Sequence, residues 1–322
     1  MSSTNNNATL HFFLFTFYKD YFYAIKYGAI PIVVIGNIGN LLSFVVLFSS
    51  KFYRNSSSGI LMMFLAFFDT LDIDLELLMS KFTRVAYWPD SLYDIRAVSQ
   101  VSCVSLTFLT KFAEHMSSWI IVLLTVERCI CVVSPTKART IWTARKAMIF
   151  FAIVFVFVGA VNSSVLAGSV RRIIDRGEYV CLAPTAAWRT YRTKYRVWVD
   201  AAMYSILPFL FIATCNTIII VQLNRSRIVA KHLNKTANKN TDSRYDNLTR
   251  LLLTVNMVFI TTTLPYQASL IHSTITSPRL FAIFVLMKHS NHAINFFIYC
   301  LAGSFFREQF ATLIRRTVCG LN

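Results

Sequence analysis

The amino-acid sequence predicts an all-α membrane protein, a bundle of seven transmembrane helices followed by a short amphipathic eighth helix. Of its 322 residues, 55% are hydrophobic and 15% aromatic, an apolar content above the usual range of soluble domains. Apolar stretches near spanning length recur along the whole chain. They are continuous rather than alternating, which indicates helices, because a helix satisfies its own backbone polar groups in lipid.

Seven stretches are expected to span the membrane. They lie at roughly residues 27–49, 59–82, 101–134, 146–168, 198–224, 247–272 and 280–301. No small-residue cleavage site precedes the first stretch, so we expect it to be an uncleaved anchor. The predicted organisation is a tail at 1–26, a membrane domain at 27–301, and an amphipathic helix with a short tail at 302–322.

The orientation follows from the short loops, because Lys and Arg in such loops favour the cytoplasmic side. The two sides carry similar numbers of basic residues, but those on one side lie in the longest loop and are partly offset by Asp175 and Glu178. We therefore expect a multi-pass protein of the plasma membrane with its N-terminus outside. The acceptor pattern at Asn7 would then be extracellular and could be glycosylated.

The composition also argues against several classes of protein. A net charge of +17 could suggest a nucleic-acid partner, but most basic residues flank spans, so we expect none. No enzyme motif of the GxSxG or HExxH kind occurs. A transporter or channel is also not indicated, because the hydropathy shows neither an internal repeat nor a pair of broken helices.

The segment after Gly303 has apolar residues at helical spacing with basic residues between them. This pattern predicts a helix that lies in the membrane interface and contacts lipids. Cys319 near its end could carry a palmitoyl group. A free cysteine in the tail is the alternative.

Polar residues share one face on three of the predicted spans. The spacing of Asp69, Asp72 and Glu76 places them on one face of the second. Because a carboxylate that faces lipid is expensive, that face must look inward. Matching faces occur on the third and seventh spans, at Thr110, Glu114 and Ser117, and at Lys288, Asn291, Asn295 and Tyr299.

A lysine inside the bundle needs a counterion. Lys288 could pair with Glu76, Asp72 or Glu114, and Lys111 lies three residues from Glu114. A structural ion pair and direct contact with a ligand are both open at this point.

Several motifs together resemble the rhodopsin-like class of G-protein-coupled receptors. They are Gly39-Asn40, Leu65-Ala66-Phe67-Phe68-Asp69, Glu127-Arg128 at the end of the third span, Pro208, Pro265 and Asn295-Phe296-Phe297-Ile298-Tyr299. The resemblance covers the chain apart from its termini. The segment from Asn291 to Arg307 is similar to invertebrate neuropeptide receptors of the FMRFamide and myosuppressin kind.

This resemblance implies a receptor that passes the binding of an outer ligand to a heterotrimeric G protein inside. It implies a disulfide between Cys103 and Cys181. In the resting state Arg128 would pair with Glu127, and on activation it would face the G protein. The residues it assigns to coupling and activation are Glu127, Arg128, Pro135, Phe259, Thr263, Pro265, Asn295 and Tyr299.

The resemblance also implies a ligand pocket. Asp200, Tyr266 and Gln267 occupy pocket positions of the class, and the inward-facing polar residues Glu76, Thr110, Lys111, Glu114 and Lys288 complete the predicted ligand set. Three acids suit a ligand cation such as the arginine of an amidated peptide. Thr110 stands where amine receptors carry an aspartate, which disfavours monoamines. The basic outer loop could instead attract an acidic ligand, and a lipid ligand is a further alternative.

No cofactor is expected beyond a sodium ion. The positions that hold sodium in the resembling class are Asp69, Ser117, Asn291 and Asn295. All four are polar, and hard oxygen ligands suit such a cation. A water-filled hydrogen-bond cluster is the alternative.

Some positions depart from the class. Thr263 replaces a tryptophan, Cys129 and Asn216 replace tyrosines, and Phe296 replaces a proline. We therefore put forward the hypothesis of elevated basal signalling, with loss of G-protein coupling as an alternative. An opsin is a further alternative. Its chromophore-binding lysine would stand at the position of His289, and Lys288, one residue earlier, would point about 100° away from that direction.

Overall fold

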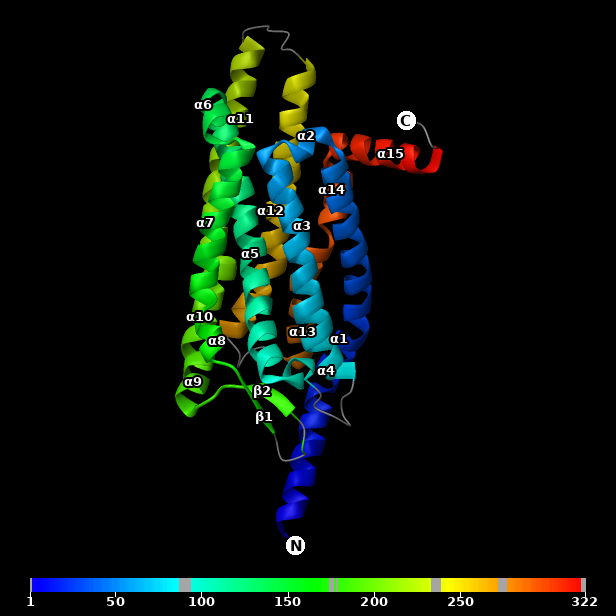
Figure 1. The fold of residues 1–322 in the computed structure, drawn as a ribbon, viewed down its shortest axis with the longest axis vertical. Helices are drawn as coiled ribbons and strands as arrows, with labels where there is room; N and C mark the ends of the chain where they lie inside the picture. The colour runs from blue at the N-terminus through cyan, green and yellow to red at the C-terminus, as the bar shows by residue number, and fades with distance from the viewer. Residues whose placement is uncertain are drawn as a thin grey trace.

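The computed structural model describes residues 2–86, 94–173, 177, 179–232, 239–271 and 277–319, with only the backbone described for 2–18, 226–232, 239–248 and 318–319, among others. In this part of the chain, long helices run side by side as one bundle (Figure 1). The helical columns are α1 (Ser2–Ser49), α3 with η1 (Ser57–Asp72, Ile73–Phe82), α5 (Gln100–Val133), α7 with α8 (Ala144–Asn162, Ser164–Ala167), α10 with η4 and α11 (Arg196–Ala201, Ala202–Ile206, Leu207–His232), α12 (Lys239–Ile271), and α13 with α14 (Pro278–Ala293, Asn295–Ala302). These columns match the seven predicted spans, although α1 begins well before residue 27.

Short elements close the two ends of the bundle. One end, here called the hairpin end, carries α4 (Thr83–Ala86), η2 (Ile95–Val98), β1 (Val170–Ile173), β2 (Tyr179–Leu182), α9 (Ala186–Thr190) and η3 (Tyr191–Tyr195). The other, here called the α15 end, carries α2 (Lys51–Arg54), α6 (Pro135–Ile141) and α15 (Ser304–Cys319). The two termini lie at opposite ends (Figure 1), as an odd number of spans requires.

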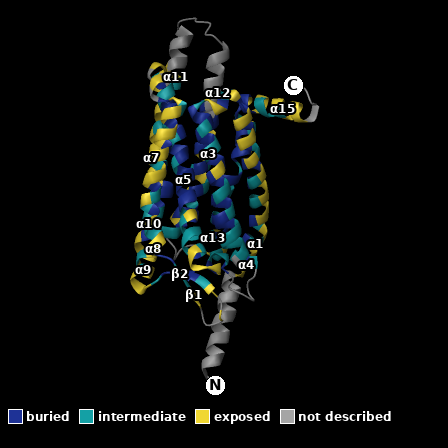
Figure 2. Ribbon diagram, in the orientation of Figure 1, coloured by how far each residue is buried: buried dark blue, intermediate teal, exposed yellow. Residues whose placement is uncertain are grey.

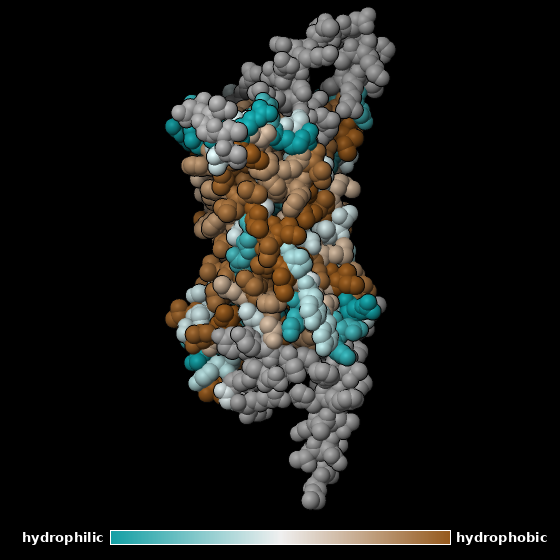
Figure 3. Space-filling model, turned by 90° about the vertical axis from the view of Figure 1, so that its right-hand side faces the viewer, coloured by the Kyte–Doolittle hydropathy of each residue, from teal (hydrophilic) through white to brown (hydrophobic). Residues whose placement is uncertain are grey.

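The lipid-facing character of the bundle appears in the distribution of apolar side chains. Buried residues face its axis and exposed ones its outside (Figure 2), and Ile38, Leu41, Ile153 and Val156 are among the exposed apolar residues. On the face shown in Figure 3, apolar side chains gather across the middle of the molecule. Among the described residues, five helices are long and apolar enough to cross a membrane. The second column carries several acids, and the seventh is divided into helices of 16 and 8 residues, so neither is among these five.

Helix α5 lies in the middle of the bundle, packed against α3, α7 and α11. It begins with a capping box, in which Ser99 and Ser102 each bond the backbone of the other. It ends at Val133 with Ser134 as its cap, and Pro135 then begins α6, a position where the missing N–H of proline costs nothing. The chain therefore defines both ends of its central helix locally.

A disulfide joins Cys103 near the start of α5 to Cys181 on β2, with a Cα–Cα distance of 5.7 Å. Strand β2 pairs antiparallel with β1. The predicted disulfide is confirmed, and it fixes the hairpin over the end of the bundle.

The seventh column is interrupted at Ile294, although no proline follows it. Phe296, at the proline position, is buried and packs edge-on against Phe306 and Phe310 of α15, with centroid distances of 6.0 and 5.3 Å. Gly39 lets α1 approach closely, since a Cβ there would lie 3.2 Å from the Cβ of Phe296. Aromatic packing against α15 therefore occupies the place of the proline.

Candidate functional site

A row of buried ion pairs crosses the hairpin half of the bundle. Lys288 on α13 contacts Glu76 on η1 at 2.6 Å and Glu114 on α5 at 2.9 Å. Lys81 forms a second ion pair with Glu76. Lys288 is 0% exposed. Two of its three predicted partners therefore hold it at once, and three helical columns are tied together.

The row continues towards the fifth column. Lys111 contacts Glu114 at 2.7 Å and Asp200 at 3.8 Å, and Asp200 accepts a 2.8 Å bond from Arg196. Arg196 also donates to the Asn162 side chain of α7 at 2.5 Å. We call the seven charged residues the charge chain; in order they are Lys81, Glu76, Lys288, Glu114, Lys111, Asp200 and Arg196.

In the charge chain, every acid lies between two cations. Taking charges out of water is expensive, and the cost is offset only where partners and geometry are good. Removing one partner leaves a buried charge uncompensated, which costs about 3 to 5 kcal/mol. The charge chain is therefore a set of mutually dependent groups in which changing one charge affects its neighbours.

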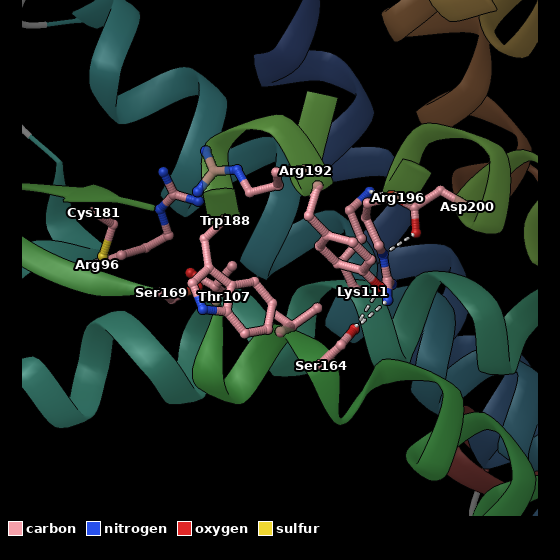
Figure 4. A pocket seen from close by; sticks show the side chains of 13 residues that line it. Arg96, Thr107, Lys111, Ser164, Ser169, Cys181, Trp188, Arg192, Arg196 and Asp200 are labelled. Atoms are coloured by element: carbon pink, nitrogen blue, oxygen red, sulfur yellow. Dashed lines mark hydrogen bonds and ion pairs between the residues drawn. The ribbon is translucent and has the colours of Figure 1, made fainter. Parts of the chain in front are cut away.

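A cavity of about 250 Å³ opens at one end of the charge chain, beneath the hairpin (Figure 4). Lys111, Asp200 and Arg196 belong both to the charge chain and to the cavity wall. The other lining residues are Arg96, Thr107, Ser164, Val165, Gly168, Ser169, Cys181, Trp188, Tyr191 and Arg192. Aromatic and basic side chains thus surround a site whose floor is an ion pair.

The remaining predicted ligand residues lie outside the cavity wall. Thr110 is buried, and its hydroxyl donates to the backbone of its own helix at 2.7 Å. The Tyr266 ring lies beneath Lys288, at 5.2 Å from ring centroid to ammonium nitrogen. Gln267 is buried, and among the described residues its carbonyl oxygen has no hydrogen-bond partner. Their role in ligand binding stays a prediction.

Deeper in the bundle, Asp69 is the centre of a second polar cluster. It is 0% exposed and accepts hydrogen bonds from Ser117 at 2.5 Å and Asn295 at 2.7 Å. The His292 side chain contacts it at 2.7 Å. His292 is not among the residues predicted for this cluster, although its position four residues after Lys288 places it on the same inward face.

Two further acids of the second column also have partners. Asp72 contacts His289 at 3.0 Å and His292 at 3.4 Å. Asp74, which faces away from the cluster, accepts a 2.8 Å bond from Asn37 of α1. Histidine at 289 therefore supports Asp72, while Asp74 ties η1 to the first helix.

At the α15 end, Arg128 and Glu127 form the predicted pair, with 3.1 Å between nitrogen and oxygen. Glu127 also accepts hydrogen bonds from Ser57 and Ser58, the latter at 2.9 Å, and Arg128 donates to Ser58. These serines open α3, where the helix dipole favours a carboxylate. The pair is therefore held against the start of α3, a contact that sequence spacing does not reveal.

Hydrogen bonds between neutral groups link α5, α12 and α11 nearby. Thr125 bonds Asn256 at 3.1 Å, and Asn256 bonds Asn216 at 3.0 Å. Asn216 replaces a tyrosine of the class, and the amide pair gives it a partner on α12.

The position of Thr263 shows how the bundle accommodates the missing tryptophan. Its hydroxyl donates to the backbone oxygen of Phe259 at 2.7 Å, four residues earlier and before Pro265. Tyr204 of η4 packs edge-on against Phe259 at 6.1 Å and bonds His292 at 3.3 Å. A tyrosine from the fifth column thus joins Phe259 to the Asp69 cluster.

Three other predicted sites have different outcomes. Tyr299 is buried and packs against Phe306 of α15 at 5.4 Å between ring centroids. The side chains of Asn7 and Cys319 lie outside the described residues. Glycosylation and palmitoylation at those two positions stay predictions.

Residues 39–299 match the family described as 7 transmembrane receptor (rhodopsin family). The chain is 26% identical over 291 residues to an FMRFamide receptor of Drosophila melanogaster, covering 86% of this chain and 51% of that receptor. It is 23% identical over 332 residues to the thyrotropin-releasing hormone receptors of Ovis aries and Bos taurus, covering 90% of this chain and 79% of each of them. The chain thus spans about half the length of the Drosophila receptor.

Proposed function

The chain belongs to the rhodopsin family of seven-transmembrane receptors, and we propose that it is a neuropeptide receptor that activates a heterotrimeric G protein. Membership of this family makes it a multi-pass membrane receptor and not an enzyme, as predicted. We place it in the plasma membrane with the hairpin end outside. The G protein would then meet the α15 end.

The observation that carries the proposal is the direct continuity of the cavity with the charge chain. Lys111 and Asp200 line the cavity, and Lys111 also pairs with Glu114, which in turn pairs with Lys288. A peptide offers both charged groups and aromatic surface, and Trp188 and Tyr191 supply a complementary wall. The relatives, whose names include FMRFamide and thyrotropin-releasing hormone, support a peptide ligand.

The contact between Lys111 and Asp200 is the weakest link of the charge chain. Its 3.8 Å separation is the longest among the ion pairs of the charge chain, and Lys111, 27% exposed, is the most exposed of the seven side chains. A cationic group of a ligand could bind Asp200 and release Lys111. A ligand shifts the equilibrium between the resting and active states only by binding one of them more tightly. A ligand that replaces Lys111 as the partner of Asp200 would favour the state in which this pair is broken.

The signal would travel along α5. This single helix carries Lys111 and Glu114 near the cavity, Ser117 beside Asp69, and Arg128 at the α15 end. A shift of α5 relative to α3 would strain the contacts of Arg128 and Glu127 with Ser57 and Ser58. Release of Arg128 would then expose it to the G protein.

The test is G-protein activation in cells that express the full chain, with FMRFamide and related amidated peptides as probes. We expect an activating peptide to be about 10-fold or more less potent on the Glu114→Gln and Asp200→Asn variants than on the wild type. Each variant removes an acid that binds either the cationic group of the peptide or Lys111, with which that group competes. The control is Asp74→Asn, an acid inside the membrane but outside the charge chain. Unchanged potency in both test variants contradicts the acidic contacts.

A second candidate is an acidic ligand, favoured by the charges of the cavity wall. Arg96, Lys111, Arg192 and Arg196 line it against one acid, Asp200. The same variants distinguish the two ligand classes. Asp200→Asn lowers the potency of a cationic peptide but raises that of an anionic ligand, because it removes a repelling charge.

A further inference from the structure

The Asp69 cluster departs from a sodium site in its chemistry. Sodium is a hard cation and requires oxygen atoms that are free to coordinate it. Both carboxylate oxygens of Asp69 already accept hydrogen bonds: Oδ1 contacts Ser117 at 2.5 Å and His292 at 2.7 Å, and Oδ2 accepts from Asn295 at 2.7 Å. Donors therefore surround the carboxylate on which the ion would depend.

His292 occupies the position between the two acids of the second column. It is 0% exposed. Its Nδ1 lies 2.7 Å from Asp69 and 3.3 Å from the Ser117 hydroxyl, while its Nε2 lies 3.4 Å from Asp72 and 3.3 Å from the Tyr204 hydroxyl. Each ring nitrogen thus faces a carboxylate.

The Nδ1 of this ring is placed to donate a hydrogen bond to the Asp69 carboxylate. The ring therefore fills the place beside Asp69 that a sodium ion would need, and its N–H points at an oxygen that would have to coordinate the ion. The four residues predicted to hold sodium, together with His292, therefore do not fit that ion.

We propose that the His292 side chain occupies the place of sodium beside Asp69, so that this receptor does not respond to sodium. Unlike an ion, His292 cannot leave the bundle. It joins α13 to α3 through Asp69 and to η4 through Tyr204, which packs against Phe259. The Asp69 cluster is then a fixed connection between these helices rather than an exchangeable site.

The test is thermal unfolding of the purified full chain in sodium chloride against N-methylglucamine chloride at equal ionic strength. We expect the wild-type midpoint to be the same in both salts. His292→Ser opens the position beside Asp69, and its midpoint should rise by about 3 °C in saturating sodium. Adding Asp69→Asn to this variant should abolish the rise.

The matched control is His289→Ser, which removes a buried histidine beside Asp72 and leaves the contacts of Asp69 in place. It should stay insensitive to sodium. If His292→Ser does not fold, His292→Asn, with a side chain of more similar size, takes its place.

A wild-type midpoint that rises in sodium and loses this rise in Asp69→Asn overturns the proposal, and this comparison needs no variant of His292. The proposal is also overturned if folded His292→Ser or His292→Asn has the same unfolding midpoint in both salts, because another group would then exclude the ion.

Discussion

At the hairpin end, ion pairs join helices that are far apart in the sequence, whereas at the α15 end the ion pair joins two neighbours on one helix. Lys288 and Glu76 are 212 residues apart. Glu127 and Arg128 are adjacent, and among the described residues their side chains bond each other and Ser57 and Ser58 of α3. Opening the first site must separate columns held by charge. Opening the second breaks mostly hydrogen bonds.

This difference indicates where the resting state is weakest. Among the described side chains, no ion pair links Arg128 to α12, and α12 is held near α5 by the hydrogen bond between Thr125 and Asn256. A hydrogen bond between neutral groups contributes about 0.5 to 1.5 kcal/mol, much less than the loss of a buried ion-pair partner. The hypothesis of elevated basal signalling therefore concerns the α15 end.

The largest effect is expected where the charge chain loses its central cation. Lys288→Met leaves Glu76 and Glu114 without their shared partner, and the receptor should lose about 3 to 5 kcal/mol of stability. Little folded receptor should reach the cell surface, as measured by surface labelling and thermal unfolding. Lys194→Met, at an exposed lysine of η3, is the control and should behave like the wild type. Normal folding of Lys288→Met would show that the charge chain does not hold the columns together.

An intermediate effect is expected at the α15 end. Replacing Ser57 and Ser58 together by alanine removes the contacts that hold Glu127 and Arg128 against α3, at a cost of about 1 to 3 kcal/mol to the resting state. Ligand-free G-protein activation should rise several-fold over the wild type at equal surface expression. The control is Thr217→Ala, whose hydroxyl donates within its own helix. Unchanged basal activity would mean that these serines do not restrain Arg128.

The smallest effect is expected at Asn256. Its replacement by alanine removes the bonds to Thr125 and Asn216, each worth about 1 kcal/mol. Basal activity should rise less than in the double serine variant, while ligand affinity at the hairpin end stays as in the wild type. Radioligand or fluorescent-peptide binding checks the second half of this prediction. A loss of affinity equal to that of Asp200→Asn would remove the distinction between the two ends.

The sequence predicts the parts of this structure that depend on local pattern. Recurring apolar stretches define the seven columns, and the spacing of Asp69, Asp72 and Glu76 places all three inward, as observed. The pairing of Cys103 with Cys181 followed from the resemblance and is confirmed.

The rest depends on which side chains meet across the bundle. His292 and Asp69 are separated by 223 residues, so no local spacing reveals their contact. The same holds for Glu127 with the serines of α3, and for Phe296 with α15. Replacements that appear as losses in the sequence, such as Asn216 and Phe296, gain new partners that only the packed structure shows.

The central claim is that ligand acts on the pair of Lys111 and Asp200. The most direct measurement is a double-mutant cycle on the potency of the activating peptide, with Lys111→Gln, Asp200→Asn and both together. If the peptide breaks this pair, the two effects should be coupled by about 1 kcal/mol or more. Effects that simply add would contradict the claim, because the two residues would then act on the peptide independently.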